Sequence, residues 1–364
     1  MSRTAVPARH SRRSSWLVLL LAVSAAVPAK EPAEDRYPWD TSPATCPTDS
    51  SSRKSAEICI VDNWRTFDET VDRLTLLFEQ ERFSLLDRAL ADIMASDKRF
   101  VSGRPASSAA YWTFRRLMSG GVTAPVFQRM VSWRRTCPDS YFAKFVEARS
   151  KYSMGWSVRG GGYRDTVAEE SWKLFDSALR GAQQDLLAAP RELKETPLWH
   201  NLMLAIALDI RNPRQNPQEI FESGVMRWPH YYDFYDLMIS RLEPRWGGSW
   251  DQVDTFIRQW TRRQEKSEGK SLYARLYINL KLLNVDPEQT RISWIMMRSS
   301  FRDLLARYPD PAFKNAYASY ACLAKDRAEY ARAIKMVDED RVLRGEWLRG
   351  TSYEQCSEWA ERAT

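Results

Sequence analysis

Apolar side chains recur along most of this chain at the three- and four-residue spacing of one helix face. From residue 64 they follow at offsets of three, seven, ten and fourteen, at Trp64, Phe67, Val71, Leu74 and Phe78. The same period predicts further helices over residues 86–93, 107–118, 125–135, 140–152, 167–188, 199–210, 218–228, 250–260 and 272–280. After residue 30 no segment shows the alternation of a half-buried strand. The pattern therefore predicts an all-α fold.

Proline and glycine mark helix ends in the second half of the chain. Pro229 cannot continue the helix before it, and Pro244 disfavours a helical conformation for the residue before it. The segment between these prolines is therefore a bounded helix. The glycine pair 247–248 then allows a tight reversal. Ser249, followed three residues later by Gln252, is typical of a capping box that opens the next helix.

The last part of the chain resembles a tetratricopeptide repeat, which is a hairpin of two helices with small residues at their crossing. The residues that carry this likeness are Pro309, Pro311, Asn315, Ala316, Tyr317, Ala318, Ala321, Lys325, Asp326, Tyr330 and Ala333. Elsewhere the period is irregular, because Pro190 and Pro229 lie farther apart than the ~34 residues of one repeat. We therefore expect degenerate tetratricopeptide-like hairpins stacked as an α-solenoid, with a non-repeating helical bundle as the alternative.

Several segments resemble one bacterial protein family. They are residues 156–163, the helix with Trp172 and Phe175, the helix start Pro197-Leu198-Trp199, the stop Trp228-Pro229 and the turn Pro244-Arg245-Trp246-Gly247-Gly248-Ser249. Three consecutive glycines at 160–162 rule out an unbroken helix there and predict a loop. Across residues 141–277 the chain is similar to domain of unknown function 4034, a family with tetratricopeptide-like helices. The resemblance implies that fold; because the family is uncharacterised, it implies no reaction or catalytic residue.

The N-terminus has the pattern of a secretory signal peptide. It begins with the basic residues Arg3, Arg9, Arg12 and Arg13. The apolar run that follows, residues 16–27, is shorter than the ~20 residues of a membrane-spanning helix, and the small residues at 27–29 predict cleavage after Ala29. An uncleaved anchor is the alternative, and the arginine pair leaves the general and the twin-arginine export routes open. We expect a periplasmic or secreted protein.

Composition divides the rest of the chain. Residues 30–58 are rich in Pro, Ser, Thr, Asp and Glu and poor in aliphatic side chains, so they cannot build a core. We expect a signal peptide at residues 1–29, a linker at 30–58, an N-terminal helical region at 59–155 and a tetratricopeptide-like domain at 156–364.

The charge balance gives no sign of a nucleic-acid partner. The full chain has 54 basic and 47 acidic residues, a net charge of +7. Loss of the four basic residues of the signal peptide leaves 50 basic residues against 47 acidic ones, a net charge of +3. A protein of this size with that charge lacks the basic footprint of a nucleic-acid-binding protein.

Five cysteines follow the predicted signal peptide, and an oxidising compartment would allow them to pair. Proximity in the sequence favours a Cys46–Cys59 disulfide, which closes a loop in the linker, and a Cys322–Cys356 disulfide, which fastens the last helix to the terminal hairpin. Cys137 is then left over. The alternative is that several of these cysteines are buried, unpaired apolar residues.

Motifs of catalysis and of metal or cofactor binding are missing. Only His200 and His230 follow the signal peptide, both beside aromatic residues at helix starts, where packing or capping is the expected role. No metal-ligand spacing and no nucleophile elbow occurs, and the glycines at 160–162 lack the Lys-Ser/Thr of a phosphate loop. We predict no metal and no cofactor.

One enzymatic hypothesis remains as the alternative. Glu170-Ser171-Trp172 resembles the Glu-Ser-aromatic stretch of lytic transglycosylases, which cleave cell-wall glycan with one protonated glutamate. A Glu170 carboxyl beside apolar groups would have a raised pKa and would act as the acid. The Gly-Leu-Met-Gln sequence expected downstream in that family is missing, however, and a carboxylate early in a helix also complements the helix dipole.

The favoured hypothesis is a non-enzymatic interaction scaffold of the cell envelope that binds a protein or peptide. Stacked helical hairpins form a concave surface suited to an extended partner. The candidate contact residues are Arg159 and Tyr163 beside the glycine loop, and Arg245 and Trp246 at the turn, because arginine binds carboxylates and tryptophan stacks on partner groups. The structural alternative is that Trp246 plugs the hairpin and Arg245 binds helix-terminal carbonyls.

Overall fold

The computed structural model describes residues 60–61, 64–210, 213, 215–281, 285–338 and 341–362, which lie in one compact unit. Its α-helices are α1 (Trp64–Glu79), α2 (Phe83–Ala95), α3 (Ser108–Leu117), α4 (Ala124–Thr136), α5 (Tyr141–Arg159), α6 (Glu169–Leu187), α7 (Arg191–Lys194), α8 (Pro197–Asp209), α9 (Pro217–Arg227), α10 (Asp233–Leu242), α11 (Trp250–Arg263), α12 (Glu265–Glu268), α13 (Ser271–Lys281), α14 (Trp294–Arg307), α15 (Pro311–Leu323), α16 (Arg327–Ile334) and α17 (Tyr353–Glu361). Short 3₁₀ turns are η2 (Arg164–Thr166), η3 (Pro244–Trp246), η4 (Pro287–Gln289) and η6 (Arg344–Glu346).

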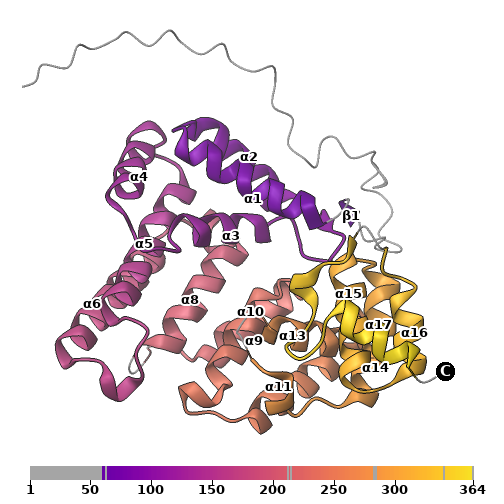
Figure 1. Ribbon diagram of the computed structural model, residues 1–364. Coiled ribbons are helices and arrows are strands. Elements are labelled where there is room, and N and C mark those ends of the chain that lie inside the picture. Colours follow the sequence, from indigo (N-terminus) through magenta and orange to yellow (C-terminus); the bar gives the residue numbers. More distant parts are fainter. Residues whose placement is uncertain are drawn as a thin grey trace, which may run out of the picture. The chain divides into compact units, whose positions relative to one another are not determined.

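The all-α prediction is confirmed (Figure 1). The predicted signal peptide and linker lie outside the described residues.

Among the described residues, the β-strands are one pair of two residues each. β1 (Ile60–Val61) pairs in parallel with β2 (Arg99–Phe100), with Ile60 opposite Arg99 and Val61 opposite Phe100. Strands this short carry no alternation of apolar and polar side chains, so the sequence pattern did not predict them.

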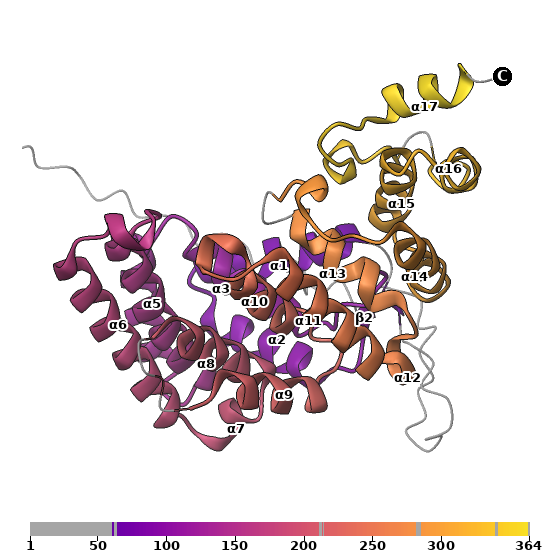
Figure 2. The same ribbon diagram turned by 90° about the horizontal axis from the view of Figure 1, so that it is seen from below.

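Helices that are neighbours in the sequence pack against each other. α5 packs along α6, α13 along α14 and α15 along α16, and both ribbon views show α5 and α6 side by side (Figures 1 and 2). α5 continues beyond the predicted residue 152, through Gly155. A Cβ atom at Gly155 would lie 2.8 Å from Leu179 Cδ1 of α6, so glycine permits the close approach of these two helices. This pairwise packing agrees with helical hairpins, whereas their stacking as an α-solenoid stays a prediction.

The helix faces predicted from the sequence form the core. In the helices predicted over residues 86–93, 250–260 and 272–280, these apolar side chains are buried: Leu86, Leu90, Ile93, Val253, Ile257, Trp260, Leu272, Leu276 and Leu280. Trp250, on the same face of α11, is partly buried. Burial of one such Leu or Ile side chain contributes ~1.5–3 kcal/mol. One hydrophobic cluster extends from Val71 to Cys356. Because α5 runs from Tyr141 to Arg159 without a break, the predicted boundary between residues 155 and 156 lies inside a helix.

The predicted helix ends at the turn before α11 are confirmed. η3 begins at Pro244, and Gly247 follows it with φ +93°, a left-handed conformation that favours glycine. A Cβ atom at Gly248 would lie 2.1 Å from the carbonyl oxygen of Leu242, so the reversal is too tight for a side chain there. Ser249 Oγ then accepts a hydrogen bond from the Gln252 N–H and caps α11.

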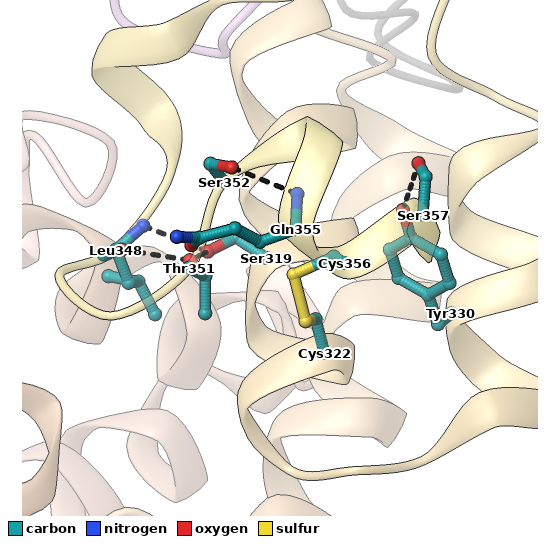
Figure 3. Close-up of a disulfide and its surroundings, with 9 residues drawn as sticks. All are labelled: Ser319, Cys322, Tyr330, Leu348, Thr351, Ser352, Gln355, Cys356 and Ser357. Atoms are coloured by element: carbon teal, nitrogen blue, oxygen red, sulfur yellow. Dashed lines mark hydrogen bonds between the residues drawn. A yellow bond between two sulfur atoms is a disulfide. The ribbon is translucent and has the colours of Figure 1, made fainter. Parts of the chain in front are cut away.

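A disulfide joins Cys322 of α15 to Cys356 of α17, with a Cα–Cα distance of 5.8 Å (Figure 3). This is the pairing that proximity in the sequence favoured. Beside it, Ser319 Oγ accepts a hydrogen bond from the Leu348 N–H, and Tyr330 and Ser357 share a hydrogen bond through their hydroxyls (Figure 3). The disulfide and these bonds fasten α17 to the preceding hairpin. Cys46 and Cys59 lie outside the described residues, and Cys137 is free.

Within the described part of the chain, each helix is either too short or too polar to cross a membrane.

Candidate ligand-binding cleft

The four candidate contact residues, Arg159, Tyr163, Arg245 and Trp246, line one cleft of about 730 Å³. Ligand pockets in proteins typically have volumes of ~300–1,000 Å³. The walls come from the end of α5 and the loop after it, α6, the end of α8, the last turn of α10, and η3. Two segments more than 80 residues apart in the sequence, chosen for their residue types alone, therefore meet at one surface.

Arg159 is a largely buried cation in the wall of the cleft. It is the last residue of α5, and Gly160, with φ +72°, ends the helix directly after it. Only 5% of Arg159 is exposed, and its Nη1 donates hydrogen bonds to the carbonyl oxygens of Gly160 at 2.9 Å and Gly162 at 3.1 Å. These bonds fold the glycine loop back over the guanidinium. Burial and the nearby charge of Arg241 lower the pKa of Arg159.

Three indole rings surround the Arg159 guanidinium. Its Cζ lies 5.1 Å from the ring centroid of Trp156, 4.9 Å from that of Trp172 and 5.3 Å from that of Trp246. Cation–π contacts of this kind contribute ~2 kcal/mol each when they are shielded from water. The rings therefore replace part of the hydration that this charge loses on burial.

Asp209 and Arg241 form an ion pair at the base of the cleft. The Asp209 side chain, the last of α8, is 2% exposed and also accepts hydrogen bonds from Tyr152 Oη at 2.7 Å and Trp156 Nε1 at 3.0 Å. Burial raises the pKa of Asp209, and the Arg241 charge opposes that shift. The Arg241 guanidinium lies 4.5 Å from the ring centroid of Trp246. This network holds α5, α8 and α10 together beneath the aromatic rings.

The η3 turn carries Arg245 and Trp246. Arg245 Nε forms an ion pair with Glu243 at 3.0 Å, so among the described residues the guanidinium binds a carboxylate. Trp246 is 37% exposed, and its ring meets Trp156 edge-on at a centroid distance of 5.9 Å. Part of the Trp246 ring therefore remains accessible in the cleft. Tyr163 lies in the loop after the three glycines, lines the same cleft and is 70% exposed.

The described lining is aromatic and basic. Its charged residues are Asp209, Arg159, Arg241 and Arg245. Glu243 is not among the lining residues and forms an ion pair with Arg245. These described lining residues include no Ser, Cys or His. Such a surface can stack on an apolar or aromatic group and can bind a negative charge.

Asp209 and Arg241 were not among the residues singled out from the sequence. They lie at the ends of two different helices, and no spacing rule links them. The one local signal is that Asp209 is the last residue of a largely apolar helix, α8. A carboxylate at such a position requires a partner if the fold buries it.

The other candidate groups lie elsewhere and have neighbours that account for them. The His200 ring packs 4.8 Å from Trp228 and 5.0 Å from Trp199, and burial lowers its pKa. His230 Nδ1 bonds to the buried carboxylate of Glu268. Among the described residues no group of three His, Cys, Asp or Glu side chains could hold a metal ion.

Glu170 is on the solvent side of α6. Its side chain is 76% exposed and forms an ion pair with Lys173 at 3.7 Å. The enzymatic hypothesis needs this carboxyl beside apolar groups, and the structure places it in water instead.

No family model, no curated protein and no solved structure matches this chain. The resemblance to domain of unknown function 4034 stays a prediction from the residues.

Proposed function

We propose that this protein is an exported, non-enzymatic scaffold of the bacterial cell envelope that holds a segment of a protein or peptide in the cleft beside α5 and η3. The observation that carries the proposal is the convergence of Arg159, Tyr163, Arg245 and Trp246 on that cleft. Contact residues of this kind dominate protein interfaces, where Trp, Tyr and Arg are enriched among the residues with the largest effects on binding.

The cleft is preorganised. The Arg159 side chain is already fixed by two backbone carbonyls and three indole rings, and Arg241 is fixed by Asp209. Ordering a long side chain on binding costs ~0.5–1.5 kcal/mol, so side chains that are fixed beforehand bind a partner with a smaller loss of entropy. This favours recognition of a defined segment over loose adhesion.

Export is part of the proposal. It rests on the signal-peptide pattern of residues 1–29. The Cys322–Cys356 disulfide supports it, because disulfides persist in oxidising compartments such as the bacterial periplasm.

The proposal is tested by photo-crosslinking in cells that produce the protein. A photoreactive amino acid replaces Tyr163, which is exposed at the cleft. In a matched control it replaces Ile295 of α14, which is 74% exposed and does not line the cleft. We expect one defined set of protein or peptide adducts from position 163 that is absent from position 295.

A second arm combines the crosslinker at 163 with Arg159→Ala and Trp246→Ala. Loss of the adducts in a variant that still has the native far-UV circular-dichroism spectrum and a cooperative unfolding transition above the growth temperature would support a binding cleft. The scaffold proposal is wrong if both positions give the same adducts, or if the adducts at position 163 are cell-wall glycan. Glycan adducts together with glycan cleavage that is lost in Glu170→Gln would establish the enzymatic alternative.

A further inference from the structure

The three arginines that line the cleft differ in whether a carboxylate forms an ion pair with them. Arg241 is paired with Asp209, and Arg245 is paired with Glu243. Arg159 donates hydrogen bonds to the carbonyl oxygens of the glycine loop and faces three indoles, and within the described residues no carboxylate lies within ion-pair distance of it. Asp209, which is paired with Arg241, acts on Arg159 only as a more distant charge. The cleft therefore holds one buried guanidinium that has no ion-pair partner of its own among the described residues.

An unpaired buried cation is costly, so its position needs a reason. Removing a charge from water is compensated only when the charge is paired and hydrogen-bonded. The two carbonyl acceptors both bind Nη1, whereas a guanidinium has five N–H donors. Both hydrogen bonds therefore use one nitrogen of the Arg159 guanidinium. Its other N–H groups remain to donate to a ligand at the wall of the cleft.

We propose that Arg159 binds the free carboxylate at the C-terminal end of a peptide whose last side chain is large and apolar, with that side chain stacked on Trp172 and Trp246. This rests on the proposed function and specifies its ligand. A carboxylate carries one negative charge and has the planar shape that a guanidinium binds through two parallel hydrogen bonds. A phosphate, with a charge near −2 at neutral pH, would need a second free cation. Among the described residues that line the cleft, the other two cations, Arg241 and Arg245, are already paired.

The walls favour a chain end over an acidic residue within a chain. Leu208, Ile210 and Phe175 line the cleft with apolar surface. A peptide that continued past its carboxylate would bring further backbone N–H and C=O groups against this surface, where they lose hydrogen bonds to water. A terminal residue has its carboxylate and its side chain on one Cα atom, so both enter together while the preceding chain leaves through the open side.

The test measures binding of acetylated tripeptides to the purified protein by isothermal titration calorimetry. The panel is acetyl-Gly-Gly-X with X as Phe, Tyr, Trp, Leu or Ile, each as the free acid and as the C-terminal amide. A third set, acetyl-Gly-Asp-X-amide, has the carboxylate on a side chain. We expect at least one free acid to bind about tenfold or more tightly than its amide, since hydrogen bonds to charged groups have effects of this size. The Asp-containing amides should bind no better than the plain amides.

Variants then assign the effect to one guanidinium. In Arg159→Gln, the free acid and its amide should bind with equal affinity. Arg159→Lys keeps the positive charge but not the planar guanidinium that donates two parallel hydrogen bonds, so it should restore part of the preference for the acid. The matched control is Arg227→Gln, because Arg227 also lies over an indole, Trp228 at 4.6 Å, but outside the cleft. The acid preference should be unchanged in that control.

The outcomes separate this inference from the proposed function. Equal binding of acids and amides by the unaltered protein would overturn the carboxylate assignment and leave peptide binding intact. Tighter binding of the Asp-containing amides would overturn the chain-end assignment. No binding by any panel member would count against both proposals.

Discussion

Asp209, the last residue of α8, forms a buried ion pair with Arg241 in the last turn of α10, directly beneath the rings of Trp156 and Trp246. The pair links two helices that border the cleft, and Tyr152 and Trp156 of α5 donate hydrogen bonds to the same carboxylate. One side chain therefore ties together three helices at the place where a ligand would bind.

Asp209→Asn should destabilise the protein. The substitution leaves the Arg241 charge without its partner in a largely buried position, and breaking a buried pair in this way costs about 3 kcal/mol or more. Urea denaturation at pH 7, followed by far-UV circular dichroism, measures the difference. The matched control is Asp251→Asn, because Asp251 pairs with Arg291 at 2.8 Å on the exposed surface, and its loss should change the free energy of unfolding by less than ~0.5 kcal/mol. Equal effects of both variants would contradict the structural role of Asp209.

Trp246→Ala should weaken partner binding more than it weakens the fold. The ring is partly exposed and contacts three arginines, so its truncation should cost about 1–2 kcal/mol of stability, while loss of a central interface tryptophan weakens binding by about 30-fold. Trp359→Ala is the matched control, because Trp359 is a partly buried indole beside Lys325 and Arg327 at the far end of the chain. If melting temperature and binding fall together in Trp246→Ala, and the control shows the same, the role of Trp246 is structural.

Asp310 should make stability depend on pH between about 4 and 6. Burial raises the pKa of Asp310 to about 6 from 3.8, although the Ala312 N–H and the Arg275 charge oppose this shift. The folded protein then keeps a proton that the unfolded chain has lost, so stability falls as the pH rises through this window. Asp310→Asn still caps α15 but cannot ionise. Relative to the unaltered protein it should gain up to about 3 kcal/mol between pH 4 and pH 7.

The control for this prediction is the N-cap of α16, Asp326. The indole N–H of Trp294 lowers the pKa of Asp326, so here the stabilising form is the ionised one, and it is lost as the pH falls through the lowered pKa. Asp326→Asn should therefore show a pH trend of opposite sign, losing stability relative to the unaltered protein as the pH rises. Urea titrations from pH 2 to pH 7 compare the two variants, because the change expected for Asp326→Asn lies mainly below pH 4. A pH-independent gain in Asp310→Asn would contradict the assignment.

Cys322→Ser or Cys356→Ser should release α17. A disulfide that closes a loop of this length, with a sequence separation of 34, contributes about 3–4 kcal/mol. Hydrogen–deuterium exchange should become faster in Tyr353–Glu361 and remain unchanged in α8, which lies far away in the sequence. Cys137→Ser is the control, because Cys137 has no disulfide partner and its exchange pattern should match that of the unaltered protein. Unchanged exchange in α17 without the disulfide would mean that Leu348 and Ser357, through their hydrogen bonds, suffice to hold it.

The sequence predicted the helices well because their determinants are local. The capped restart at Ser249 and the break at the glycine loop depend on residues a few positions apart, and both are present in the structure. The extension of α5 through Gly155 was not predicted, because the benefit of glycine there comes from Leu179 on another helix. The sequence also singled out Arg159, Tyr163, Arg245 and Trp246, but as two separate groups.

The sequence by itself thus determined the all-α class and the ends of most helices, since backbone hydrogen bonds and apolar periodicity act over a few residues. It also singled out four residues as candidates for contact with a partner, a role that stays a prediction. Only the tertiary structure decided that these residues share a cleft, that Asp209 neutralises Arg241, and that Arg159 remains unpaired among the described residues. Whether a buried charge has a partner depends on which helix ends meet in space, and no spacing along the chain encodes that.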